Sequence, residues 1–323
     1  MRLRVAPLTA WNRFWFAPGS ARNLAAARIV IALHALWIVL SRDYGGVSGL
    51  PSDLWSGVTT LDRVRYAIVP AHPMLEHGLT VVAVVALLAV AAGWATRVSG
   101  LVAALLLYHL APFETILWTT SPYERGLEIS TLSLVVLCVA PCADVWSVTA
   151  RRRTGQDTSS EYNWPLLLIQ LFVAQVYLFS GWSKLFRVGW SWVSAENLRH
   201  WLLLFTQEDQ IAVFRGPGTW FAAHPALCLL IAVGSITLDL TFIVVLAWKR
   251  ARKVYVPLAA AFHLGIFFTM NIAFLNLPQL LVFVDWDWVT NRLQRGRLVE
   301  ADLVAARPRR EPDQPPQQEA VSH

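Results

Sequence analysis

The chain lacks the residue groupings on which most enzyme classes depend. It has only three cysteines, and Cys138 and Cys142 are four residues apart, which is not the C-x-x-C spacing of a redox pair. We expect them to pack between helices. The sequence has no Cys/His cluster, no H-x-x-E-H-type spacing and no EF-hand loop, so nothing in it supports a metal site. A glycine-rich phosphate loop and a G-x-S-x-G nucleophile elbow are also absent, which argues against nucleotide-binding enzymes and serine hydrolases.

Charged residues are also scarce. They make up 15% of the 323 residues, whereas hydrophobic residues make up 56%. This balance is too apolar for an ordinary soluble enzyme, and several apolar runs approach the roughly 20 residues needed to cross a bilayer. The net charge is +6, and most lysines and arginines fall in segments that we assign to one side of the membrane. The sequence therefore predicts an all-α, polytopic protein of the cell membrane, with the lipid bilayer and no nucleic acid as its partner.

The apolar runs predict about eight spans with both termini in the cytoplasm and no large soluble domain. Residues 254–288 would be roughly 50 Å long as one helix, too long for a ~30 Å membrane core. We expect two short or tilted spans there, separated at Asn276-Leu277-Pro278. The predicted segments are an N-terminal interfacial segment (1–23), a transmembrane domain (24–290) and a basic, disordered cytoplasmic tail (291–323). The spans are expected near residues 24–40, 79–95, 98–117, 126–146, 164–185 and 223–248, with the pair in 254–288.

Lysine is the rarest charged residue, and this makes Lys184 stand out. Lys249 and Lys253 lie in a Lys-Arg-Ala-Arg-Lys cluster typical of a membrane loop, but Lys184 ends the apolar run of residues 164–185. An ionisable side chain at a membrane edge is costly and is therefore a functional candidate. Such a lysine can lose its proton and act as a base. The alternative is an interfacial anchor that extends its amine to the interface beside Trp182.

Three further residues share a helical face with Lys184. Residues three, four and seven apart lie on one side of a helix, which places Gln170, Tyr177, Gly181 and Lys184 on one stripe. A polar stripe on a membrane helix is expected to face the protein interior or a wet cavity. Gly181 leaves room there for a ligand or a neighbouring helix.

Polar residues of other spans are expected at the same depth. Glu128 opens the fourth span, His109 lies in the third and Asn271 ends the seventh. Glu128 is equally explained as a helix N-terminal acid favoured by the macrodipole. His34, His109 and His263 are each isolated in an apolar helix, where a structural hydrogen bond is the simpler role.

Arg28 lies one turn inside the first span. It either extends toward the cytoplasmic face or pairs with an inner carboxylate such as Asp144. The sequence leaves both possibilities open.

The segment Tyr177-Leu-Phe-Ser-Gly181-Trp-Ser-Lys184-Leu185, followed by Gly189-Trp190-Ser-Trp192, resembles the HTTM domain. This domain is shared by vitamin K-dependent gamma-carboxylase and many bacterial membrane proteins, and the chain resembles a bacterial short form. The resemblance covers roughly residues 20–290. In the carboxylase, the lysine that ends an A-G-x-K-K-L stretch is the base that deprotonates reduced vitamin K. Lys184 matches that lysine, with Ser183 where the carboxylase has a second lysine.

The resemblance implies a reduced quinone of the vitamin K type as cofactor and a carboxylase-like or oxygenase-like reaction at the outer face. Lys184, with Glu128 or His109 to orient the amine or the quinol oxygen, would be catalytic. The residues expected around the cofactor are Tyr177, Gly181, Trp182 and Asn271. One related bacterial group takes part in maturing secreted toxin peptides, so a secreted peptide is a second expected partner.

A non-catalytic function remains the main alternative. The chain would then be a membrane scaffold, an immunity factor or a maturation partner, with Lys184 in a structural ion pair. A transporter is less favoured, because no paired broken helices are evident at the bilayer midplane and no inverted repeats are apparent.

Overall fold

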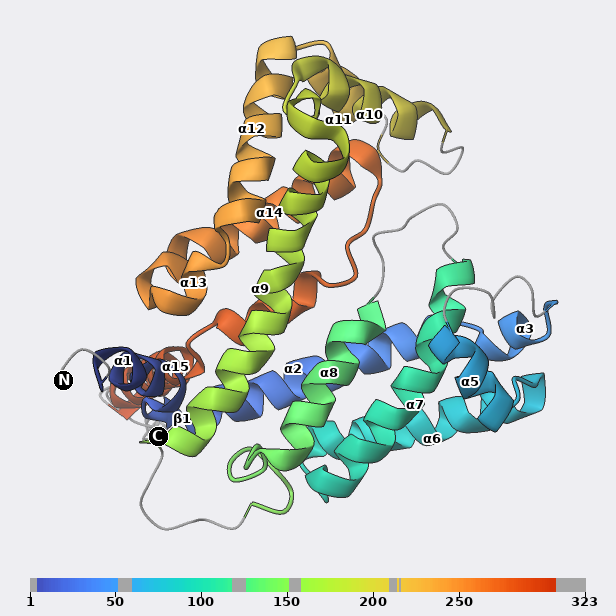
Figure 1. Ribbon diagram of the computed structural model, residues 1–323. Helices are drawn as coiled ribbons and strands as arrows, with labels where there is room; N and C mark the ends of the chain where they lie inside the picture. The colour runs from blue at the N-terminus through green and yellow to red at the C-terminus, as the bar shows by residue number, and fades with distance from the viewer. Residues whose placement is uncertain are drawn as a thin grey trace, which may run out of the picture. The chain divides into compact units, whose positions relative to one another are not determined.

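The computed structural model describes residues 5–51, 60–117, 126–150, 158–208, 214 and 216–305. These residues are almost entirely helical (Figure 1), and the all-α prediction is confirmed. Strands β1 (Gly19–Ser20) and β2 (Thr158–Ser159) form one short antiparallel pair. The chain divides into two units, Met1–Val284 and Asp285–His323.

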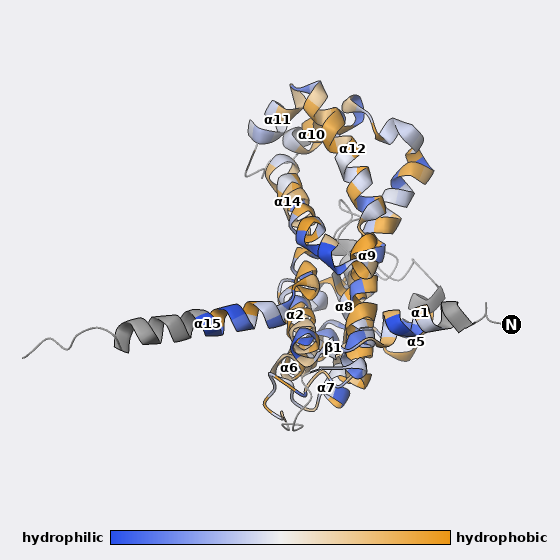
Figure 2. Ribbon diagram, turned by 90° about the vertical axis from the view of Figure 1, so that its left-hand side faces the viewer, coloured by the Kyte–Doolittle hydropathy of each residue, from blue (hydrophilic) through white to orange (hydrophobic). Residues whose placement is uncertain are grey.

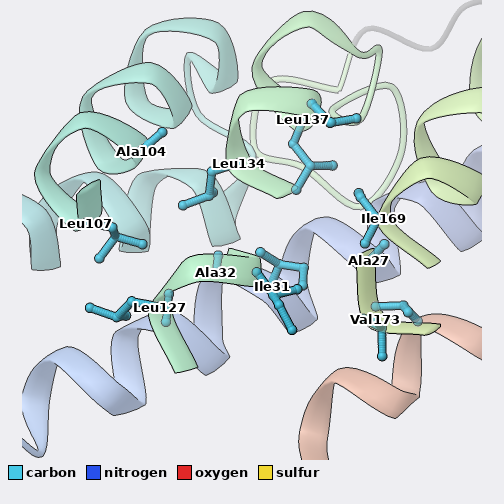
Figure 3. Packing of buried hydrophobic residues seen from close by; sticks show 14 of the residues in the cluster. Ala27, Ile31, Ala32, Ala104, Leu107, Leu127, Leu134, Leu137, Ile169 and Val173 are labelled. Carbon is cyan, nitrogen blue, oxygen red and sulfur yellow. The ribbon is translucent and has the colours of Figure 1, made fainter. Parts of the chain in front are cut away.

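The first group of helices in the larger unit is built around one apolar helix. α2 packs against α6 and α8, and α7 packs against the same two helices. Figure 3 shows Ala27, Ile31 and Ala32 of α2 surrounded by apolar side chains of the neighbouring helices. Two short helices, α3 and α5, belong to the same part of the chain. The bounds are α2 (Ala21–Leu40), α3 (Tyr44–Ser48), α5 (Thr60–Ile68), α6 (Pro73–Ala92), α7 (Thr96–Leu117) and α8 (Gly126–Val139).

The ends of α6 show why its residues form this helix. His72 caps the first turn by accepting a hydrogen bond from the Met74 backbone, and Pro73 occupies the first turn, where its missing N–H costs nothing. Gly93 ends the helix in the left-handed conformation, with φ of 76°. A Cβ atom at Gly93 would lie 2.1 Å from the Cβ of Ser147, so the turn also requires glycine for space.

Helix α9 (Ser160–Val188) connects the first group of helices to a second (Figure 1). Its 29 residues make it roughly 43 Å long at 1.5 Å per residue. It contacts α1 (Val5–Phe16), α2 and α8 on one side, and α12 of the second group on the other. The second group contains α10 (Ala195–Glu208), α11 (Gly216–Ala222), α12 (Pro225–Thr241), α13 (Val244–Ala247) and α14 (Arg252–Met270), with 3-10 turns η1 (Gly189–Trp192), η2 (Lys249–Ala251) and η3 (Leu277–Phe283).

The helices have the length and composition of membrane spans. Within the described ranges five helices are long and apolar enough to cross a bilayer, or six if α11 and α12, bent by 99°, form one broken span. Hydrophobic residues predominate along α2, α6 and α14 (Figure 2), and large ones such as Val81 and Val85 are more than 60% exposed. This is the pattern of a lipid-facing helix. The predicted count of eight spans is not confirmed.

The region predicted as the seventh and eighth spans differs from expectation. α14 ends at Met270, because Asn271 adopts the left-handed conformation with φ of 58° and caps the helix. The break therefore precedes the predicted position at Pro278. The chain continues without helix and then forms η3, whose seven residues are too few to span. One helix of span length occupies this region rather than two.

The fourth predicted span is also shorter than expected. α8 ends at Val139, so Cys142 lies beyond the helix that contains Cys138.

Both ends of the chain contain helices outside the predicted spans. α2 begins at Ala21, three residues before the predicted start, and α1 precedes it with Trp11 and Phe16 exposed. The smaller unit contains α15 (Trp286–Ala305), where Trp288 N–H donates to the Asp285 carboxylate at 3.3 Å. The first part of the tail predicted to be disordered is therefore helical. Residues 306–323 lie outside the described residues.

Arg28 takes neither of the two roles considered for it. Its side chain is fully buried, and its guanidinium donates to the carbonyl oxygens of Cys142 (2.6 Å), Trp146 (2.5 Å) and Ala91 (3.4 Å). Asp144 instead accepts from the Tyr162 hydroxyl at 2.8 Å. A helix leaves its last carbonyls without intrahelical donors, and Arg28 supplies donors to the end of α6 and to the turn after α8.

Replacing Arg28 with glutamine should therefore destabilise the protein. The change leaves buried carbonyls without donors and should lower the free energy of unfolding by about 3 kcal/mol. Thermal unfolding in detergent measures this. The matched control is Arg97→Gln, because Arg97 is exposed at the start of α7 and should change stability by no more than about 0.5 kcal/mol. Equal shifts in the two variants would contradict this role of Arg28.

Candidate functional site

The site begins with a close contact between α9 and α12 at Gly181. A Cβ atom at Gly181 would lie 2.8 Å from the Cβ of Asp239 and 3.1 Å from the side chain of Leu240. Only a residue without a side chain allows this approach. Because Lys184 lies one turn further along α9, the same contact brings its amine to α12.

Lys184 forms an ion pair with Asp239. The Lys184 Nζ and Asp239 Oδ2 atoms are 2.7 Å apart, and the side chains are 18% and 4% exposed. The Lys184 Nζ lies 5.5 Å from the centre of the Trp192 ring in η1, within the range of a cation–π contact. Lys184 is therefore held between Asp239 of α12 and Trp192 of η1.

A second polar pair lies two turns back along the same face of α9. The Tyr177 hydroxyl and the His263 Nε2 of α14 are 2.8 Å apart. Tyr177 stacks on Phe242 at 4.2 Å between ring centres, and His263 contacts the Phe274 ring at 4.5 Å. The other ring nitrogen of His263, Nδ1, is buried and has no hydrogen-bond partner among the described residues.

The predicted polar stripe of α9 faces the protein interior. Gln170, Tyr177 and Gly181 are buried, and Lys184 is mostly so. Gln170 donates to the Val282 carbonyl at 2.8 Å and accepts from Arg252 at 2.9 Å. Helical spacing thus predicted the inner face of α9 correctly. The structure places Tyr177, Gly181 and Lys184 of this face in one cluster.

Two other predicted cofactor residues lie apart from this cluster. Trp182 is 60% exposed and stacks on Phe186 on the outside of α9. Asn271 makes two hydrogen bonds of 3.0 Å with the backbone of Phe214, one as donor and one as acceptor. These contacts tie the end of α14 to the segment before α11.

The two other predicted catalytic residues also lie on different helices from Lys184. Glu128 is in the first turn of α8 with an exposed side chain. His109 of α7 pairs with the fully buried Glu76 of α6, with 2.9 Å between Nε2 and Oε1. The Tyr66 hydroxyl donates to the His109 carbonyl at 3.3 Å. The carboxylate beside Lys184 is therefore Asp239, and the carboxylate beside His109 is Glu76.

His34 has the structural role expected of an isolated histidine. Its Nδ1 lies 3.0 Å from the Ser130 hydroxyl, and its Nε2 lies 2.9 Å from the Leu275 carbonyl oxygen. It thus joins α2 to α8 and to the segment before η3. No group of three or more His, Cys, Asp or Glu side chains that could hold a metal occurs in the described part of the chain.

Asp239 is the site residue that sequence reasoning missed. It lies within the apolar run Ile236-Thr-Leu-Asp239-Leu240. An acidic residue inside an apolar span is as costly as a lysine at its edge, so the sequence alone could have identified Asp239 as a candidate. The sequence could not predict its pairing with Lys184, because the pairing depends on how α9 and α12 pack.

The HTTM domain family model matches residues 16–288, which include every residue of this cluster. The chain belongs to the HTTM family. The resemblance seen around Lys184 is thereby confirmed. No curated protein matches the chain, and no solved structure does. Family membership and the apolar helices together support a membrane protein.

The close contact at Gly181 gives a direct test of how the HTTM site is assembled. Gly181→Ala should force α9 and α12 apart, weaken the Lys184–Asp239 pair and cost about 1–3 kcal/mol of stability. The control is Gly234→Ala on α12, where an added Cβ meets nothing within 4 Å and alanine should stabilise the helix by roughly 0.5–1 kcal/mol. Thermal unfolding of both variants measures the difference, and a neutral Gly181→Ala would argue against the contact.

Proposed function

We propose that this HTTM protein is a quinol-dependent membrane enzyme with carboxylase-like or oxygenase-like activity, and that Lys184 lies at its reaction centre. The observation that carries the proposal is the buried Lys184–Asp239 pair on the face of α9 that also presents Tyr177 to His263. A lysine and a carboxylate at hydrogen-bond distance can accept, hold and return a proton. Buried titratable pairs of this kind cluster at functional sites.

The aromatic side chains near Lys184 support a flat, hydroxyl-bearing aromatic ring as the proposed ligand. The rings of Tyr177, Phe242, His263 and Phe274 contact one another in this cluster. The buried Nδ1 of His263 has no partner in the described residues, and a ligand hydroxyl would satisfy it. A reduced quinone, when bound, supplies a weakly acidic hydroxyl group and reducing equivalents.

The protein's own residues have separable tasks in this proposal. Lys184 contacts the quinol hydroxyl and accepts its proton at Nζ. Tyr177 and His263 hold the quinol ring, and Gly181 keeps α9 close to α12. The roles predicted for His109, Glu128, Trp182 and Asn271 stay predictions, since these residues lie elsewhere on the helices. The Glu76–His109 pair is chemically similar to the Lys184–Asp239 pair, because each joins a carboxylate to a basic side chain.

The remaining expectations concern location and partners. We propose that the protein lies in the cell membrane with both termini in the cytoplasm. The exposed Lys249 and Arg250 between α13 and α14, and the exposed Lys253 in the first turn of α14, support a cytoplasmic loop there. A secreted peptide remains the proposed partner.

One observation favours a non-catalytic alternative, in which the protein is a scaffold, an immunity factor or a maturation partner. Lys184 already has a carboxylate partner, as a structural ion pair would. This alternative expects Lys184→Arg to be tolerated, because arginine preserves the pair, and Lys184→Glu to disrupt folding, because two carboxylates would then face each other. The quinol proposal expects Lys184→Arg to fold normally and to lose activity.

The deciding experiment is the extraction of bound lipids from the purified full-length protein, followed by mass spectrometry for quinones. Wild type should carry a naphthoquinone in near-stoichiometric amount, and Lys184→Ala should lose about tenfold or more, which corresponds to about 1.4 kcal/mol of binding. Lys249→Ala is the matched control, because Lys249 is exposed, and should retain the quinone. If all three proteins fold and none contains quinone, the quinol proposal fails and the scaffold alternative is favoured.

A further inference from the structure

We propose that Asp239 is the residue that finally holds the proton removed at this site, and that Lys184 relays the proton to it. Before the transfer, Lys184 is an ammonium. Asp239 acts on the ligand through Lys184 and is therefore a positioning residue. The inference rests on the proposed function, because it concerns the hydroxyl group bound at the same site.

The contacts around the pair favour its charged form. Asp239 receives a hydrogen bond from Lys184 at 2.7 Å, and this charge-assisted bond stabilises a carboxylate. The face of the Trp192 ring, 5.5 Å from Nζ, attracts a cation. A buried charge persists when it is paired and hydrogen-bonded, and both members of this pair meet that condition.

The polar groups that face the pair come from several elements. Tyr177 and Ser180 lie beside it on α9, Trp192 lies in η1, and His263 lies on α14. Asp239 is near enough to act electrostatically on Tyr177, and Lys184 on His263. The Tyr177–His263 pair is therefore close to the ion pair. A ligand hydroxyl at His263 Nδ1, which has no partner among the described residues, would share this environment.

An ammonium has no lone pair, so Lys184 cannot accept a proton until it has given one away. The relay supplies both steps. One N–H bond of Lys184 breaks as an O–H bond forms on Asp239 Oδ2, and the O–H bond of the bound hydroxyl breaks as a new N–H bond forms on Nζ. Lys184 remains positive, Asp239 becomes neutral and the ligand oxygen becomes negative, so the total charge is unchanged.

This charge balance also indicates the class of ligand. After the transfer, the ammonium lies beside the new oxyanion and stabilises it, while the neutral Asp239 no longer repels it. A neutral, weakly acidic hydroxyl, such as that of a phenol or hydroquinone, fits this sequence of charges. A ligand that arrives as an anion has no proton to give at this position.

The small number of lysines makes the resting charge of Lys184 directly measurable. Full-length protein labelled at the lysine side-chain carbon and nitrogen gives signals from Lys184, Lys249 and Lys253 alone, and Lys184→Arg assigns the first. Wild-type Lys184 should show the NMR signal of an ammonium at neutral pH. The signal of a neutral amine in wild type would overturn the relay. This measurement does not depend on whether an Asp239 variant folds.

The variants Asp239→Asn and Asp239→Glu test the proton acceptor with a chosen probe. Reduced menadione is added without oxygen, and the absorbance of its anion is recorded together with the amount bound. Wild type and Asp239→Glu should form the anion, and Asp239→Asn should bind a similar amount and form about 100-fold less. The control Glu196→Gln, at an exposed acid of α10, should behave like wild type.

The outcomes separate the two proposals. If Asp239→Asn forms the anion as well as wild type while Lys184→Ala does not, Lys184 is itself the base, and the relay is overturned while the proposed function stands. If wild type binds no probe and forms no anion, the proposed function fails and the relay fails with it. Loss of the anion in Asp239→Asn at unchanged probe binding, with rescue by Asp239→Glu, supports both, because loss of a purely structural ion pair would lower the amount of probe bound as well.

Discussion

The absence of water from the bilayer core imposes the constraint on which this structure depends. A polar group inside such a protein must find its partner within the chain, because lipid offers none. The buried charges follow this rule in different ways. Arg28 donates to backbone carbonyls, Glu76 pairs with His109, and Asp239 pairs with Lys184. Each of these contacts joins at least two helices, so the polar groups determine which helices lie together.

The two titratable pairs of the larger unit differ in their surroundings. His109 and Glu76 belong to α7 and α6, with the aromatic rings of Tyr66 and Phe113 against the imidazole. Lys184 and Asp239 belong to α9 and α12, beside the Tyr177–His263 pair. Among the described residues, each arrangement leaves one buried polar atom without a partner, Glu76 Oε2 in the first and His263 Nδ1 in the second. The second arrangement is distinguished by the two polar pairs that lie on one face of α9.

Sequence periodicity predicted what depends on a single helix. The spacing of Gln170, Tyr177, Gly181 and Lys184 correctly identified the inner face of α9, because side-chain direction along a helix is set locally. It did not predict Asp239 as the partner, since the distance between α9 and α12 depends on the missing side chain of Gly181 and on the volume of Leu240. The end of α14 was misplaced for a similar reason. Asn271 ends the helix through its own backbone conformation and its hydrogen bonds to Phe214. The hydrophobic periodicity of a segment does not predict a hydrogen bond to a residue that is far away in the sequence.

The hydrogen bonds from the buried Arg28 guanidinium to backbone carbonyl oxygens have a consequence for biosynthesis. Its carbonyl partner at Cys142 lies 114 residues further along the chain, so a ribosome working at about 10 residues per second needs roughly 10 s to produce it. During that interval the first span carries an arginine whose final partners do not yet exist. The nascent helix must wait near the headgroups or beside the insertion machinery, and it settles only when the turn after α8 has emerged. Insertion of this protein is therefore a delayed assembly, in which the first span is fixed only after the turn that follows α8 has been made.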